Sequence, residues 1–254
     1  MISKNYKTNE IKPDITLGNL AFTAGDLLFD WVPFEIPLGS VELKDVSGYI
    51  MGTDAGAQAG ELFNLVFAKS TNGVAPTSLG TVNSAISSAN SMLCRNNIIG
   101  YYSVDFGEQA DAVLDSLISY NVFGKNYSTG TNPNFQGLVL EGEPGGATRA
   151  GHQTIYVAGI AEAGFNFGTG VLIAGTHSAD DLTIVVDGND ADKVLAVGDV
   201  IYAAAAADGT SATADMTITA VGEELITVSS APAITDNFEV VPKNPISLRF
   251  GFEY

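Results

Sequence analysis

The chain has 254 residues, with 29 aspartates and glutamates against 11 lysines and arginines, so its formal net charge is −18. Hydrophobic residues make up 46% of the sequence, which is enough apolar material for a folded core and excludes wholesale disorder. Nucleic-acid binding needs clustered lysine and arginine side chains, so the acidic balance argues against a DNA-binding or DNA-packaging role.

The start of the chain is polar, and the longest unbroken apolar run, at residues 200–207, is far shorter than a membrane-spanning helix. We therefore expect neither a secretory signal nor a membrane span, and we expect synthesis in a host cytoplasm. Cys94 is the only cysteine, so an internal disulfide is excluded and the core must hold the fold.

Most segments of the first two thirds alternate apolar and polar residues with the period of a β-strand. Glu61 to Ser70 is more continuously apolar, which favours a central strand between two layers. The predicted strands of this part span residues 40–52, 61–70, 97–104, 135–141 and 154–160.

One segment has a different period. Between Glu108 and Ser119 the apolar residues recur every three or four positions, with acidic residues in the first turn, where the helix dipole favours them. This spacing predicts a short helix.

The last third becomes richer in aspartate, alanine and threonine after about Gly175. Its predicted strands span residues 182–186, 199–203, 216–221 and 225–229. Residues 182–186 followed by 198–201 resemble residues 225–228 followed by 237–241, which gives two similar halves, each a strand, a short excursion and a second strand. A small barrel of five or six strands would remove their exposed edges. The final strand, residues 246–254, is aromatic like the first part, so we expect the chain to return there.

The sequence thus predicts an all-β protein: an antiparallel β-sandwich with one short helix and an inserted small β-barrel. The sandwich takes residues 13–175 with 244–254, the barrel takes residues 176–243, and residues 1–12 form an N-terminal arm.

Catalytic and metal-binding motifs are weak. His152 and His177 are the only histidines and lie in no ligand spacing, and no Gly-x-Ser-x-Gly motif is present. The acidic run at residues 187–192 suits a hydrophilic hairpin turn better than a calcium loop. We expect no enzyme activity, no cofactor and no metal.

Two groups of residues are candidates for contact with a partner or another subunit. The first is an aromatic and aliphatic stretch stiffened by prolines, which is typical either of a core anchor or of an interface and could also present a sugar-binding platform. Its members are Phe29, Trp31, Val32, Phe34 and Ile36. The second group, Lys4, Lys7 and Lys12, lies in the N-terminal arm, which either extends over a partner or frays.

Four stretches resemble virion structural proteins of marine tailed bacteriophages: LFDWVPFEIPLG at residues 28–39, FAKS at 67–70, PTSLGTVN at 76–83 and IYVAGIA at 155–161. The barrel stretch VGDVIY, at residues 197–202, is also similar to small β-modules of such proteins. The resemblance implies a head decoration or cement protein on the outer capsid surface. Its implied partners are the major capsid protein and copies of itself, with a trimer as one candidate, and neither nucleic acid nor membrane.

Two alternatives stay open at this point. A tail or baseplate component would share the composition and the barrel. A carbohydrate-binding adhesin on the virion surface would use the aromatic residues or the acidic run at residues 187–192.

Overall fold

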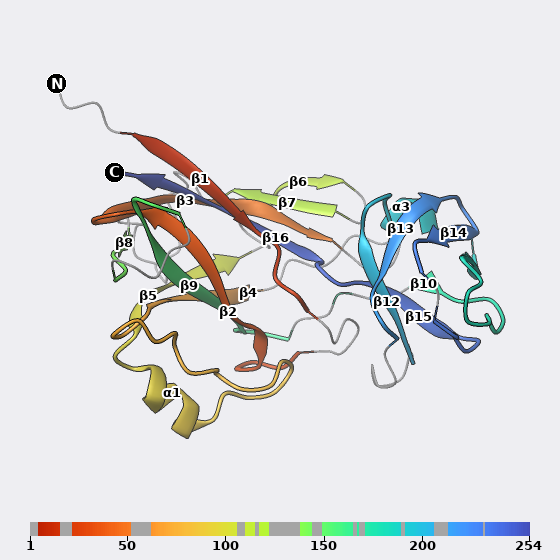
Figure 1. The fold of residues 1–254 in the computed structure, drawn as a ribbon, viewed down its shortest axis with the longest axis horizontal. Helices are drawn as coiled ribbons and strands as arrows, with labels where there is room; N and C mark the ends of the chain where they lie inside the picture. Colours follow the sequence, from red (N-terminus) through yellow and green to blue (C-terminus); the bar gives the residue numbers. More distant parts are fainter. Residues whose placement is uncertain are drawn as a thin grey trace.

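A computed structural model describes residues 5–15, 22–51, 62–105, 110–114, 117–121, 138–143, 149–164, 167, 171–188, 191–205, 213–230 and 232–254. It confirms the predicted fold class, because antiparallel sheets form a sandwich and a small barrel. The two lie next to each other along the long axis of the molecule (Figure 1).

The first sheet of the sandwich contains both ends of the chain. Its strand order is β1-β16-β3-β7-β6, and β8 also pairs with β3. The final strand therefore lies between the first strand and β3, which confirms the predicted return of the chain. The strands are β1 (Tyr6–Ile11), β3 (Val41–Met51), β6 (Ala110–Leu114), β7 (Leu117–Asn121), β8 (Leu138–Leu140) and β16 (Ile246–Glu253).

The second sheet has the order β2-β9-β4-β5. Strand β4 is paired on both sides, as its continuous apolar sequence predicted. The strands are β2 (Leu27–Pro37), β4 (Leu62–Lys69), β5 (Ile98–Asp105) and β9 (His152–Ala161).

The two sheets meet through phenylalanine side chains. The ring of Phe34 on β2 stacks on Phe250 and Phe252 of β16, with centroid distances of 5.1 and 5.9 Å. Phe67 on β4 meets Phe250 edge-on at 5.5 Å. Because aromatic pairs of this kind add to the free energy gained by burial, these four rings form the centre of the sandwich.

The helix predicted at residues 108–119 is wrong. The described residues of this stretch belong to the antiparallel strands β6 and β7, in which Val113 pairs with Ile118 and Leu114 with Leu117. Strand β3 offers β7 a full ladder of backbone partners, and tertiary pairing overrides a weak local preference.

A short helix forms elsewhere, at α1 (Ser88–Cys94), where the Ser87 hydroxyl accepts a hydrogen bond from Asn90 N. It belongs to residues 70–97, which we call the covering layer. This layer lies on the side of the second sheet that faces away from the first sheet (Figure 1). Leu79 and Cys94 of the layer pack with Leu27 and Ala158 of the sheet.

The barrel sheet has the order β10-β15-β12-β13-β14-β11. An antiparallel bridge between Ile173 and Val186, flanked by a hydrogen bond from Ala174 N to Val185 O, joins its two ends and closes it. The elements are β10 (Val171–Leu172), β11 (Thr183–Val185), α3 (Ala191–Val194), β12 (Val200–Ala205), β13 (Met216–Val221), β14 (Leu225–Val228) and β15 (Phe238–Pro242).

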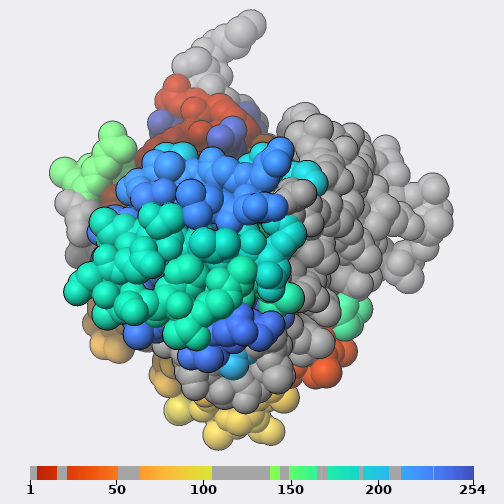
Figure 2. Space-filling model, turned by 90° about the vertical axis from the view of Figure 1, so that its right-hand side faces the viewer, coloured from red at the N-terminus to blue at the C-terminus, as the bar shows by residue number. Residues whose placement is uncertain are grey.

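The barrel has internal two-fold symmetry in its strand pairing. Each half supplies three strands, β10-β11-β12 and β13-β14-β15. The second strands of the halves pair with each other, the third strands do the same, and each first strand pairs with the third strand of the other half. The predicted repeat is confirmed. Figure 2 shows one face of the barrel, on which residues of the first half (teal) lie between residues of the second half (blue).

The barrel meets the sandwich at Lys243. Its ammonium group pairs with Asp14 and with Asp215 of the barrel, and both hydrogen bonds raise the lysine pKa. The backbone of Ile15 donates to Lys243 O, and the Tyr202 hydroxyl donates to Ile15 O. The junction thus combines these polar contacts with a small apolar cluster of Tyr202, Ala204 and Val241, and the two main cores remain separate clusters.

We expect Phe250→Ala to lower the free energy of unfolding by about 3–5 kcal/mol, because the ring is fully buried between the sheets. Tyr101→Ala, at a side chain that is 69% exposed, is the matched control and should change it by less than about 0.5 kcal/mol. Urea unfolding followed by circular dichroism measures the free energy of unfolding of both variants. An equal decrease in the two variants would contradict the aromatic core.

Replacing residues 171–242 with a short Gly-Ser linker should leave the sandwich folded. Val171 pairs with Val240, so the two ends of the excised segment are neighbours and the core of the barrel is its own cluster. Truncation after Lys243 removes β16 and should abolish folding. Soluble expression and circular dichroism distinguish the two variants, and aggregation of the first would show that the barrel supports the sandwich core.

Candidate functional site

Apart from Lys12, the predicted contact residues that the structure describes lie on β1 and β2, the neighbouring edge strands of the two sheets. The side chain of Asn9 on β1 donates to the backbone oxygen of Glu35 on β2, so the strands are joined by a side chain instead of a ladder. We call β1, β2 and the turn at residues 149–152 the seam. The fold thus brings together two groups that are separate in the sequence.

Three of the predicted contact side chains on β2 are unavailable to a partner. Phe29, Phe34 and Ile36 are at most 6% exposed and belong to the sandwich core. A Cβ at Gly159 would overlap the Phe29 ring, so this ring occupies the space above a glycine. The proline-flanked stretch is therefore a core anchor at these positions, and the interface interpretation is corrected for them.

Trp31 and Val32 are partly exposed. Val32 packs on the edge of the sandwich core. The indole of Trp31 packs beside Leu27 and Cys94, and its Nε1 donates to Thr77 O at 2.9 Å. Trp31 therefore holds the covering layer against the sheet while part of its surface stays accessible.

Lys7 has an unusual partner. Its Nζ lies 2.9 Å from Nε2 of His152, and the other ring nitrogen, Nδ1, lies 3.1 Å from Ala150 O. A carbonyl oxygen only accepts, so Nδ1 carries the proton and Nε2 accepts from the lysine. The contact requires a neutral imidazole.

The electrostatics of the seam are cationic around Lys7. Partial burial lowers the pKa of Lys7, the nearby charge of Arg149 lowers it further, and Glu35 raises it. The Glu35 carboxylate also accepts a hydrogen bond from Arg149 N. Lys7 forms no ion pair with any carboxylate of the described residues, whereas Lys44 and Lys243 each pair with two.

The remaining lysines of the predicted group are separate from this cluster. Lys12 is exposed, and its backbone oxygen accepts from the side chain of Asn244 near the barrel junction. Lys4 lies outside the described residues. The arm is thus partly a strand, since β1 pairs with β16 along its whole length.

Sequence reasoning missed Arg149 and noted His152 only as a histidine in no ligand spacing. Arg149 lies in the turn before β9 and His152 is the first residue of β9. Both are more than 140 positions from Lys7, so no local spacing could relate them to it. The glycine of the turn, Gly151, has φ +75° and gives a local signal of the turn itself.

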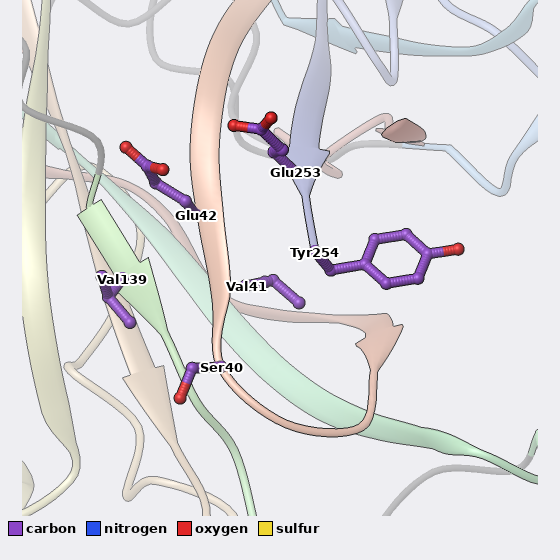
Figure 3. A pocket seen from close by; sticks show the side chains of 6 residues that line it. All are labelled: Ser40, Val41, Glu42, Val139, Glu253 and Tyr254. Atoms are coloured by element: carbon purple, nitrogen blue, oxygen red, sulfur yellow. The ribbon is translucent and has the colours of Figure 1, made fainter. Parts of the chain in front are cut away.

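A shallow hollow of about 210 Å³ lies near the last residues of the chain (Figure 3). Its lining consists of Ser40, Val41, Glu42, Val139, Glu253 and Tyr254. Lys44 pairs with the carboxylates of Glu42 and Glu253 and thereby satisfies both. Tyr254 and Val139 are about half exposed, so the hollow combines an aromatic ring with two carboxylates.

No group of three or more histidine, cysteine or acidic side chains suited to a metal ion occurs among the described residues. Within those same ranges no helix is both long enough and apolar enough to span a bilayer. A comparison with protein-family models finds no match to the chain, and a search of curated proteins finds no significant match.

We expect Trp31→Phe to lower the free energy of unfolding by about 0.5–1.5 kcal/mol, because the ring is retained while the hydrogen bond to Thr77 O is lost. Trp31→Ala should cost more, since it also removes the packing against the covering layer. Trp31 is the only tryptophan, so neither variant retains tryptophan fluorescence. Urea unfolding is therefore followed by circular dichroism. Unchanged stability of both variants would show that the ring does not anchor the layer.

Proposed function

We propose that this chain is a structural virion protein of the head decoration or cement type, which binds the outside of an assembled capsid and stabilises it. In this proposal its partners are the major capsid protein and further copies of the chain. The observation that carries the proposal is a concentration of exposed apolar side chains on the covering layer and the adjoining strand β5.

Five of the thirteen exposed large apolar residues that the structure describes come from one stretch of 28 positions, residues 74–101. Helix α1 even presents Met92 and Leu93 to solvent while burying only Cys94. Exposed apolar surface of this kind is typical of protein interfaces. The five residues are Val74, Met92, Leu93, Ile98 and Tyr101.

The net charge supports addition to a preformed shell rather than self-assembly. Copies carrying −18 repel each other wherever apolar contact does not outweigh the repulsion, and the same net charge repels DNA. Apolar contact through the covering layer would give a short-range attraction to a capsid. Association should therefore strengthen as salt screens the repulsion.

The resemblance stretches also converge in space. Those at residues 28–39, 67–70 and 155–161 lie on or extend from β2, β4 and β9, which are adjacent in the second sheet. The fourth, residues 76–83, belongs to the covering layer. All four therefore belong to one unit of the fold, the sheet that carries the proposed contact surface.

The test is to mix the purified protein with capsids that lack it and to measure bound copies and the resistance of the capsids to heat or osmotic shock. We expect saturable binding and greater resistance. Leu93→Glu, which adds a charge at a 63% exposed position, should reduce binding at least about tenfold. Val197→Glu on the barrel, at 64% exposure, is the matched control and should bind normally.

Failure to bind capsids, or binding to purified tails alone, would overturn the cement role and favour a tail or baseplate component. Equal binding by both glutamate variants would leave the capsid role but contradict the contact surface. Analytical ultracentrifugation of the free protein determines whether it is a monomer or an oligomer such as a trimer.

One observation supports a second candidate function, a carbohydrate-binding adhesin. The hollow beside Tyr254 has an exposed aromatic ring and carboxylates, which suit the faces and hydroxyls of a sugar. Of the adhesin elements predicted from the sequence, the phenylalanines of β2 are buried, and the acidic run at residues 187–192 lies partly outside the described residues. A glycan array with wild-type protein and Tyr254→Ala tests this, and absence of any Tyr254-dependent signal rejects it.

A further inference from the structure

We propose that the Lys7 cluster of the seam is a binding site for one carboxylate group presented by a partner protein. The type of ligand is inferred from the residues of the seam and their contacts. The identity of the partner as a capsid protein rests on the proposed function. The cluster consists of Lys7, Arg149, His152 and Glu35.

The first argument is that Lys7 has N–H donors that no described residue accepts from. An ammonium group has three N–H donors, and among the described residues Lys7 uses one of them, toward His152. It is partly buried, so water compensates its charge less well than on an open surface. An added carboxylate would supply acceptors for the two remaining donors and would add to the countercharge of Glu35.

The second argument is the charge balance of the cluster. Lys7 and Arg149 carry +2 and Glu35 carries −1, so the cluster is +1 with neutral His152, in a chain whose total is −18. Three of the thirteen lysine, arginine and histidine side chains of the chain meet at this point. A positive centre on an acidic protein attracts a negative group at short range and therefore selects its position.

The third argument explains why the ligand is a single carboxylate and not a nucleic acid. An extended chain of phosphates would place most of its charge against the acidic remainder of the surface, which repels it. A single aspartate or glutamate side chain on an otherwise neutral partner surface meets only the cluster. Its two oxygens accept charge-assisted hydrogen bonds from neighbouring donors, which are stronger than neutral ones.

The fourth argument is that His152 couples binding to pH. Protonation turns Nε2 from an acceptor into a donor, which breaks the contact with Lys7 and raises the charge of the cluster from +1 to +2. Among the described residues, Lys7 on β1 contacts His152 directly, and Arg149 in the turn and Glu35 on β2 are the charged groups that act on Lys7. Without a ligand, acidification therefore adds repulsion to the seam, and a bound carboxylate relieves it.

The experiment uses the full-length free protein and two blocked peptides that differ in one group, acetyl-Gly-Glu-Gly-amide and acetyl-Gly-Gln-Gly-amide, with inorganic phosphate as a third probe. Amide NMR shifts are titrated at pH 8 and pH 5.5. We expect the glutamate peptide alone to shift the amides around Lys7, Arg149 and His152, with affinity at least about threefold higher at pH 5.5. Lys7→Met should lower this affinity about tenfold, and Lys12→Met, on an exposed lysine five positions away, should not.

His152→Gln retains an acceptor for Lys7 but cannot gain a proton, so it should bind the peptide with no difference between the two pH values. This variant keeps the proposal falsifiable if Lys7→Met fails to fold. Equal shifts from the glutamine peptide, unchanged affinity in Lys7→Met, or tighter binding of phosphate than of the glutamate peptide would each overturn the carboxylate site.

The outcome is independent of the capsid experiment. A protein that binds the glutamate peptide but no capsid retains the site and loses the cement role. A protein that binds capsids equally well with Lys7→Met and shows no peptide binding retains the cement role and loses the site.

Discussion

Strand β16 makes the contacts on which the rest of the structure depends. It pairs with β1 on one side and with β3 on the other, so it supplies the backbone partners that connect the start of the chain to the first sheet. Its inward side chains, Leu248, Phe250 and Phe252, are fully buried, and two of them stack on Phe34 of the opposite sheet. Because β16 follows all the other strands in the chain, the sandwich core is complete only after β16 has been synthesised.

This dependence explains the position of the barrel. The barrel is inserted immediately before β16, and its closed ring of strands leaves no edge that could compete with β1 or β3 for pairing. Its own core and its pairing symmetry make it self-sufficient. The link to the sandwich combines ion pairs of Lys243 with a small apolar cluster around Tyr202, and it fixes position without merging the two main cores.

The sequence was informative wherever side-chain alternation coincided with pairing in the fold. Strands β3, β4 and β16 and the repeat of the barrel followed from apolar periodicity, since their buried faces are determined by that period. The stretch at residues 108–119 misled because alternation in two short consecutive strands can imitate helical spacing. At the seam, the sequence identified Lys7 and the β2 stretch, but which side chains of β2 point inward and which turn meets Lys7 depend on bulges and on pairings between distant strands.

The arrangement of charge and apolar surface suggests how specificity could arise on so acidic a protein. A uniform negative surface discourages contact in every orientation, so the few places that depart from it determine how the molecule docks. Among the described residues, two places depart from it: the apolar side chains of the covering layer and the cationic cluster of the seam. Both adjoin β2, which contacts the layer through Trp31 and the cluster through Glu35. Apolar contact would supply most of the affinity, whereas the cationic cluster would fix the orientation by requiring one carboxylate at one position. A single edge strand thereby connects the stability of the sandwich to both proposed contacts.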